Sequence, residues 1–114
     1  MFGGVFATHA SNKMIKDEHV DYICRGEGEE AVMEMCRKLC NGERIDNVKN
    51  FTLKGNGQVY KNPLREAVDI STVPIPNWDL FDPRSIYRPM EGKIWRAIGV
   101  ETQRGCPYTC TYCN

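Results

Sequence analysis

The chain has 114 residues, and its 15 basic and 15 acidic side chains cancel to a formal net charge of zero. Without a Lys- and Arg-rich block, neither nucleic acid nor an anionic membrane surface is an expected partner. No stretch approaches the roughly 20 apolar residues of a membrane-spanning helix, and the first residues lack the features of a secretory signal. We therefore expect a cytoplasmic protein. Six cysteines in such a protein favour metal or redox chemistry over a disulfide scaffold.

The first 48 residues have the pattern of an α/β layer. Residues 2–8 read as the end of a strand that runs into a glycine turn, and residues 11–18 predict a short helix capped by Ser11 or Asn12. Residues 20–24 are a β-prone run, and a longer amphipathic helix follows between Gly26 and Gly42. Strand, glycine loop and helix in this order are typical of an α/β fold.

This longer helix carries two cysteines, Cys36 and Cys40, one helical turn apart. Both fall on the apolar stripe of the predicted helix, and free cysteine is among the most buried residue types. We therefore expect both thiols, and that of Cys24 in the preceding strand, to pack in the core.

Residues 49–92 predict a hairpin and a connector. The runs 50–54 and 58–60 are joined by Gly55-Asn56-Gly57, which is a strong hairpin signal. Between residues 63 and 89 lie five prolines, together with Trp78 and Phe81, as expected for an extended linker held by aromatic anchors. Residues 94–102 then predict a strand that leads directly into a cysteine-rich loop.

This loop contains three thiols, Cys106, Cys110 and Cys113, in the spacing C-x3-C-x2-C. Three thiolates so close in sequence can bind one metal centre. On a four-iron cluster they leave one iron without a protein ligand, whereas a structural zinc site normally has a fourth ligand. The pair Cys110 and Cys113 alone is also compatible with half of a zinc site or with a redox dithiol.

With Arg104-Gly105 before the first cysteine and Tyr112 before the last, the loop resembles the signature of radical S-adenosylmethionine enzymes. The resemblance implies that Cys106, Cys110 and Cys113 ligate a [4Fe-4S] cluster and that Tyr112 lies beside the adenine of S-adenosylmethionine. It also implies a barrel of the TIM type, an external electron donor of the flavodoxin or ferredoxin type, and a small-molecule or peptide substrate.

The first part of the chain resembles the C-terminal half of the Rossmann-like cobalamin-binding domain that precedes some radical S-adenosylmethionine domains. The residues that carry this resemblance are Gly3-Gly4 and the later run Gly26-Glu27-Gly28-Glu29. By resemblance, these six residues line the edge where the nucleotide tail of cobalamin lies, and glycine permits close approach of the backbone to such a ligand. Glu27 and Glu29 could bind ribose hydroxyls or could simply favour the helix N-terminus.

The expected fold is therefore α/β, in three parts. Residues 1–48 form the C-terminal part of a Rossmann-like cobalamin-binding domain, residues 49–92 the hairpin and Pro-rich linker, and residues 93–114 the first strand and cluster loop of a partial TIM-type radical S-adenosylmethionine barrel. We expect a fragment of an enzyme that generates a 5′-deoxyadenosyl radical and uses it for methyl transfer, ring formation or another rearrangement. The fragment alone is expected to be inactive. The alternatives are a small Cys-ligated metal-binding or electron-transfer module and a ligand-binding domain in which the cysteine loop is incidental.

Overall fold

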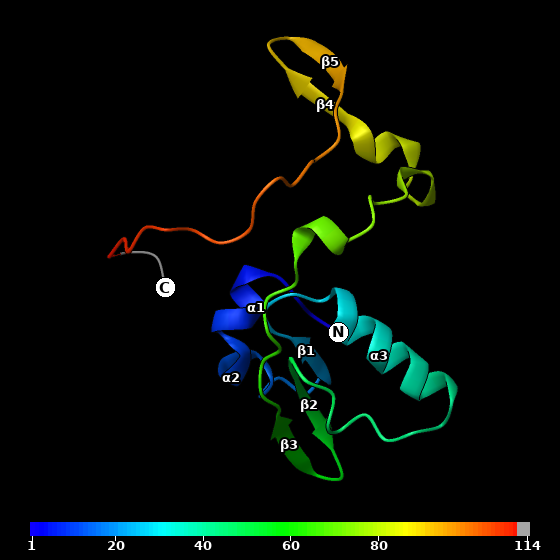
Figure 1. Ribbon diagram of the computed structural model, residues 1–114, viewed down its shortest axis with the longest axis vertical. Coiled ribbons are helices and arrows are strands. Elements are labelled where there is room, and N and C mark those ends of the chain that lie inside the picture. Colours follow the sequence, from blue (N-terminus) through cyan, green and yellow to red (C-terminus); the bar gives the residue numbers. More distant parts are fainter. Residues whose placement is uncertain (112–114) are drawn as a thin grey trace. The chain divides into compact units, whose positions relative to one another are not determined.

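The computed structural model describes residues 1–111, and the chain divides into two units, Met1–Ala67 and a second that begins at Val68 (Figure 1). The first unit contains a three-stranded antiparallel sheet of β1 (Tyr22–Cys24), β2 (Phe51–Gly55) and β3 (Gln58–Lys61), in that order. The predicted hairpin is confirmed as β2 and β3. Its turn residues, Asn56 and Gly57, have φ values of 50° and 75°, which suit the two-residue hairpin turn whose twist matches that of the strands.

Helices cover both faces of this sheet (Figure 1). On one side lie α1 (Val5–His9) and α2 (Ser11–Met14), and on the other lies α3 (Glu29–Cys40). The helix predicted over 11–18 is confirmed only in its first turn, and the predicted side-chain cap is wrong. Instead, α2 continues from α1, because the Ala10 N–H bonds to the Phe6 carbonyl and the Met14 N–H to that of Ala10. The strand end and glycine turn predicted over 2–8 are wrong beyond Gly4, because only Phe2 pairs as in a strand and the chain enters α1 at Val5.

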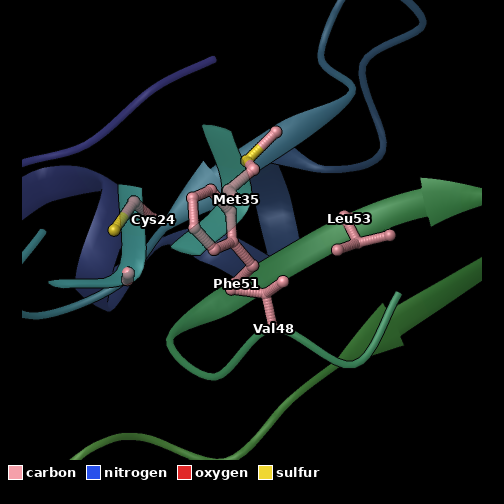
Figure 2. Close-up of a cluster of buried hydrophobic side chains, with 6 residues drawn as sticks. Cys24, Met35, Val48, Phe51 and Leu53 are labelled. Carbon is pink, nitrogen blue, oxygen red and sulfur yellow. The ribbon is translucent and has the colours of Figure 1, made fainter. Parts of the chain in front are cut away.

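Two buried clusters hold these layers together. Successive side chains of a strand point to opposite faces, so Cys24 packs toward α3 and Ile23 toward the other two helices. Figure 2 shows Phe51 and Val48 beside Met35 of α3. The cluster on the α3 side consists of Cys24, Ala31, Met35, Val48, Phe51 and Leu53. The opposite cluster consists of Ala7, Ile15, Val20 and Ile23.

Helix α3 confirms the predicted helix and its end, but not the burial of its cysteines. Gly42 has a φ of 68° and the Glu43 N–H bonds to the Lys38 carbonyl, the expected glycine C-terminal motif. Cys24 is buried as predicted, whereas Cys36 and Cys40 are both exposed. The buried face of α3 runs through Ala31 and Met35. Cys36 is turned by about 100° from Met35 around the helix axis, which takes it off that face.

The hairpin belongs to the first unit, whereas the sequence grouped residues 49–92 with the linker. Phe51 and Leu53 are almost fully buried under α3, and the segment of β2 from Phe51 to Leu53 pairs with β1. The segment after β3 is held against α3, because Arg65 forms ion pairs with Glu30, at 3.2 Å, and with Glu34, both of α3. Apolar residues on one face of the hairpin therefore complete the core.

Asn50, directly before β2, is a buried polar residue whose hydrogen bonds connect two separate segments of the chain. It is 3% exposed and has a left-handed φ of 72°. Its side-chain amide donates to the Glu27 carbonyl at 2.7 Å, and its side-chain oxygen accepts from the Arg65 N–H at 2.6 Å. Its backbone carbonyl accepts the Arg25 N–H at 2.9 Å. One side chain thus joins the loop before α3 to the chain that leaves β3.

Replacing Asn50 with Ala should destabilise the first unit by roughly 2–4 kcal/mol. The substitution leaves a buried donor and acceptor unpaired and places alanine in the left-handed region, which asparagine tolerates better. Asn50→Gly loses the same hydrogen bonds but relieves the backbone strain, so it should cost less than Asn50→Ala. Urea unfolding followed by far-ultraviolet circular dichroism measures both values. Equal losses in the two variants would contradict a contribution from backbone conformation.

The second unit contains short helical turns and one hairpin. Single 3-10 turns span Ile70–Thr72, Trp78–Leu80 and Pro83–Ile86, and β4 (Tyr87–Met90) pairs antiparallel with β5 (Lys93–Arg96). None of the described residues from 68 onward is buried. The strand predicted over 94–102 is therefore wrong beyond Arg96. Apart from the Ala97 N–H, which bonds to the Ile86 carbonyl, no described segment supplies ladder hydrogen bonds there.

The α/β class is thus confirmed at a coarse level. The pairing of Phe2 with Ile23 is parallel, as an α/β layer requires, but β1, β2 and β3 are antiparallel. The Rossmann-like and TIM-type assignments remain predictions.

Candidate functional site

Two glycine turns lie at one edge of the first unit. Phe2 pairs in parallel with Ile23, and the Phe2 N–H bonds to the Tyr22 carbonyl while the Cys24 N–H bonds to the Phe2 carbonyl, both at 2.9 Å. Parallel segments end at the same edge, so Gly3-Gly4 and the turn that begins at Gly26 leave the sheet side by side. In open α/β sheets, ligands bind outside the carboxyl ends of such strands.

Both turns use glycine for its backbone freedom. Gly4 and Gly26 have φ values of 88° and 68°, and a Cβ added to either would meet no atom within 4 Å. Their open faces can therefore receive another molecule close to the backbone. Gly28 differs, because a Cβ there would lie 3.6 Å from the Cys24 sulfur and 3.7 Å from a Val32 methyl group. Gly28 packs against the core and does not contribute such an open face.

Two polar side chains that the sequence analysis did not select hold the second turn. The Thr8 hydroxyl accepts a hydrogen bond from the Gly26 N–H at 2.9 Å and donates to the Gly4 carbonyl at 3.0 Å. The Asn50 side-chain amide donates a hydrogen bond to the Glu27 carbonyl. Neither contact has a local sequence signal, since Thr8 and Asn50 lie 18 and 23 residues from their partners.

The structure thus brings together the six residues that the sequence analysis predicted to bind cobalamin. Gly3 and Gly4 form the first turn, Gly26, Glu27 and Gly28 form the second, and Glu29 begins α3. Glu29 and Glu30 lie in the first turn of α3, where acidic side chains are favoured by the helix dipole.

Cys24 lies beneath the second turn, with its sulfur against Gly28. Burial, and after it the negative charge of Glu29, raises the pKa of the Cys24 thiol from its ordinary value of 9.0. The folded unit therefore holds this proton more tightly than the unfolded chain does. The resulting contribution to stability is fully present below about pH 9 and is lost as the pH rises further.

We expect the free energy of unfolding of the chain to fall more steeply between pH 7 and about pH 10 than that of the Cys24→Ala variant. The variant lacks the thiol whose ionisation favours the unfolded chain at high pH, while every other titrating group is shared. Urea unfolding at the two pH values measures the difference. Equal slopes in the two proteins would contradict a raised pKa for Cys24.

The cysteine loop belongs to the second unit. Cys106 and Cys110 are exposed free thiols, and Gly105 before them has a left-handed φ of 84°. Arg104 forms an ion pair with Glu101 at 3.0 Å at the base of the loop. Tyr112 and Cys113, the other residues predicted for this site, lie outside the described residues. Within residues 1–111, no three potential ligands come together to hold a metal ion.

The connector contains a groove that the sequence analysis did not predict. It has a volume of about 480 Å³ and is lined by the rings of Trp78 and Phe81, the apolar side chains of Ile86 and Ile98, and the charged Asp79 and Arg96. The two rings lie 5.3 Å apart between centroids. The residues expected to anchor the linker therefore pack against each other and form one wall of this groove.

No helix in the described part of the chain has the length and apolar character needed to cross a bilayer.

Comparisons with known proteins show several enzymes to which the chain is similar. It is 31% identical, over its whole length, to an anaerobic magnesium-protoporphyrin IX monomethyl ester cyclase from Synechocystis, of which it covers 22%. Over 83% of its length it is 32% identical to an uncharacterized methyltransferase from Pyrococcus horikoshii, of which it covers 20%. It is also 26% identical, over its whole length, to the cyclase of Rubrivivax gelatinosus, of which it covers 21%.

The chain therefore spans about a fifth of the length of the curated relatives that it matches. No family model and no solved structure matches it. Similarity over the whole chain to cyclases from two organisms indicates, at a coarse level, that the chain corresponds to part of an enzyme.

Proposed function

We propose that the chain is part of a radical S-adenosylmethionine enzyme and supplies the loop that binds its [4Fe-4S] cluster. The observation that carries the proposal is the spacing of Cys106, Cys110 and Cys113, found in a chain that is similar along its length to a cyclase. The relatives are named a cyclase and a methyltransferase, and ring closure and methyl transfer are two outcomes that we expected of radical chemistry.

The described part of the loop suits such a cluster. Cys106 and Cys110 are both free thiols, and both are exposed on a segment without regular secondary structure that follows a left-handed glycine. Thiolates are the usual ligands of iron–sulfur clusters. Together with Cys113, these residues would hold three irons. When bound, such a cluster would offer one open iron to S-adenosylmethionine and would supply the electron that cleaves this cofactor to methionine and a 5′-deoxyadenosyl radical.

In this proposal, the residues of the chain bind the cluster, hold the loop in place and contact the cofactor. Cys106 and Cys110 bind the cluster, and the Arg104–Glu101 ion pair holds the start of the loop. Tyr112, outside the described residues, would lie beside the adenine of S-adenosylmethionine. The exposure of the loop also suits an encounter with an electron donor of the flavodoxin or ferredoxin type.

We further propose that the two glycine turns contact the nucleotide tail of cobalamin. Support comes from the open faces of Gly4 and Gly26, where no atom lies within 4 Å of an added Cβ, and from their position at one edge of the sheet. Glu27 and Glu29 lie beside this surface and would accept hydrogen bonds from ribose hydroxyls.

Anaerobic reconstitution with iron and sulfide tests the cluster assignment. We expect about four irons per chain and an electron paramagnetic resonance signal of the reduced cluster that changes when S-adenosylmethionine is added. Stoichiometric zinc without iron would refute the proposal and favour a zinc-binding module.

A further inference from the structure

We propose that Thr8 is a positioning residue that joins the two glycine turns into one fixed backbone surface. Its hydroxyl forms a hydrogen bond to each turn, with the Gly26 N–H at 2.9 Å and the Gly4 carbonyl at 3.0 Å. The role in ligand binding rests on the function proposed above. The coupling between the turns does not.

A hydroxyl is well suited to this place because it donates one hydrogen bond and accepts others. The Gly4 carbonyl also accepts the backbone N–H of Thr8 at 3.0 Å, so the hydroxyl is its second donor, whereas the Gly26 N–H finds its acceptor in the hydroxyl. Val has nearly the same shape as Thr but offers neither, while Ser keeps both functions. The donation to Gly4 is the common bond of a helical Thr to the carbonyl four residues before it. The bond from Gly26 is different, because it reaches across 18 residues to another loop.

The first residue of the Gly26 turn depends on this hydrogen bond to hold its position. Gly26 has a φ of 68° and open space on its Cα, so packing does not hold it. The Glu27 carbonyl is bound by Asn50 at 2.7 Å, which fixes the Glu27–Gly28 peptide. Without the Thr8 hydroxyl, the turn keeps the hydrogen bond from Asn50 to Glu27. It should therefore stay in place but open locally more often. The bond to Gly26 is also exposed, so water replaces it with little effect on global unfolding.

Hydrogen exchange on the 114-residue chain tests this coupling without any ligand. In Thr8→Val, the Gly26 amide should exchange about five- to tenfold faster than in the wild type, as expected from the loss of one hydrogen bond. In Thr8→Ser it should exchange as in the wild type, and the urea midpoint should be nearly unchanged in all variants. Thr72→Val is the matched control, because the Thr72 hydroxyl also donates to a main-chain carbonyl but lies outside both turns.

Unchanged exchange at Gly26 in Thr8→Val would overturn the proposal, as would fast exchange in Thr8→Ser. If Thr8→Val unfolds the chain, Thr8→Ala removes the same hydroxyl without adding a methyl group, and the same criteria apply to it.

Titration with hydroxocobalamin tests the role in binding. We expect Thr8→Val to bind about tenfold more weakly than the wild type and Thr8→Ser to bind equally well. Equal binding by Thr8→Val, despite its faster exchange, would overturn the positioning role toward ligand. If the wild type does not bind cobalamin, that part of the proposed function fails, while the exchange data still decide whether Thr8 couples the turns.

Discussion

Replacing either Cys106 or Cys110 with Ala should abolish assembly of the iron–sulfur cluster, so that reconstituted iron falls from about four atoms per chain to background. Each thiolate of a three-cysteine site holds a different iron, and two remaining ligands leave the cluster open to solvent and to loss. Both thiols are exposed, so neither substitution creates a cavity that would unfold the chain. Iron and acid-labile sulfide content, with absorption and electron paramagnetic resonance spectra, measure the outcome.

Cys36→Ala is the matched control. Cys36 is also an exposed free thiol, but it lies on α3 outside the motif, so this variant should retain the full cluster. Iron that persists in both Cys106→Ala and Cys110→Ala would contradict the proposed ligands. Zinc bound in place of iron would support the alternative of a small metal-binding module.

Local sequence signals were enough to predict the elements that are bounded by characteristic turn or helix-ending residues. The β2–β3 hairpin was predicted from Asn56-Gly57, and the end of α3 from Gly42, because both positions require a backbone that glycine or asparagine adopts readily. Helix α1 was missed because it has only five residues, and its one buried side chain, Ala7, depends on contacts with distant residues. The β4–β5 hairpin was missed because Pro89 made its first strand read as linker.

The sequence predicted the glycine and glutamate residues of the candidate site, but not the hydrogen bonds that hold its turns in place. The glycine turns were selected from Gly3-Gly4 and Gly26, and the parallel pairing of Phe2 with Ile23 places them side by side. Thr8 and Asn50 were not selected, because a threonine in a helix and an asparagine before a strand are common, and only the folded chain gives them partners. The exposure of Cys36 likewise depends on which face of α3 meets the sheet.

Replacing Phe51 with Ala should destabilise the first unit by roughly 3–5 kcal/mol, the usual cost of removing a buried aromatic side chain. Phe51 is fully buried at the start of β2, between Met35 of α3 and Val48 (Figure 2). At typical values per residue, a unit of residues 1–67 has a free energy of unfolding of roughly 3–10 kcal/mol. Much of that unit should therefore unfold in this variant. Far-ultraviolet circular dichroism across a urea titration measures the loss.

Val59→Ala is the control for this prediction, because Val59 lies on β3 and is 52% exposed. It should change the free energy of unfolding by no more than about 0.5 kcal/mol. Since Phe51 begins the strand that follows Asn50, its loss should also release the Glu27 carbonyl and expose the Gly26 turn to rapid hydrogen exchange. A Phe51→Ala variant that keeps slow exchange at Gly26 would show that the glycine turns do not depend on this core.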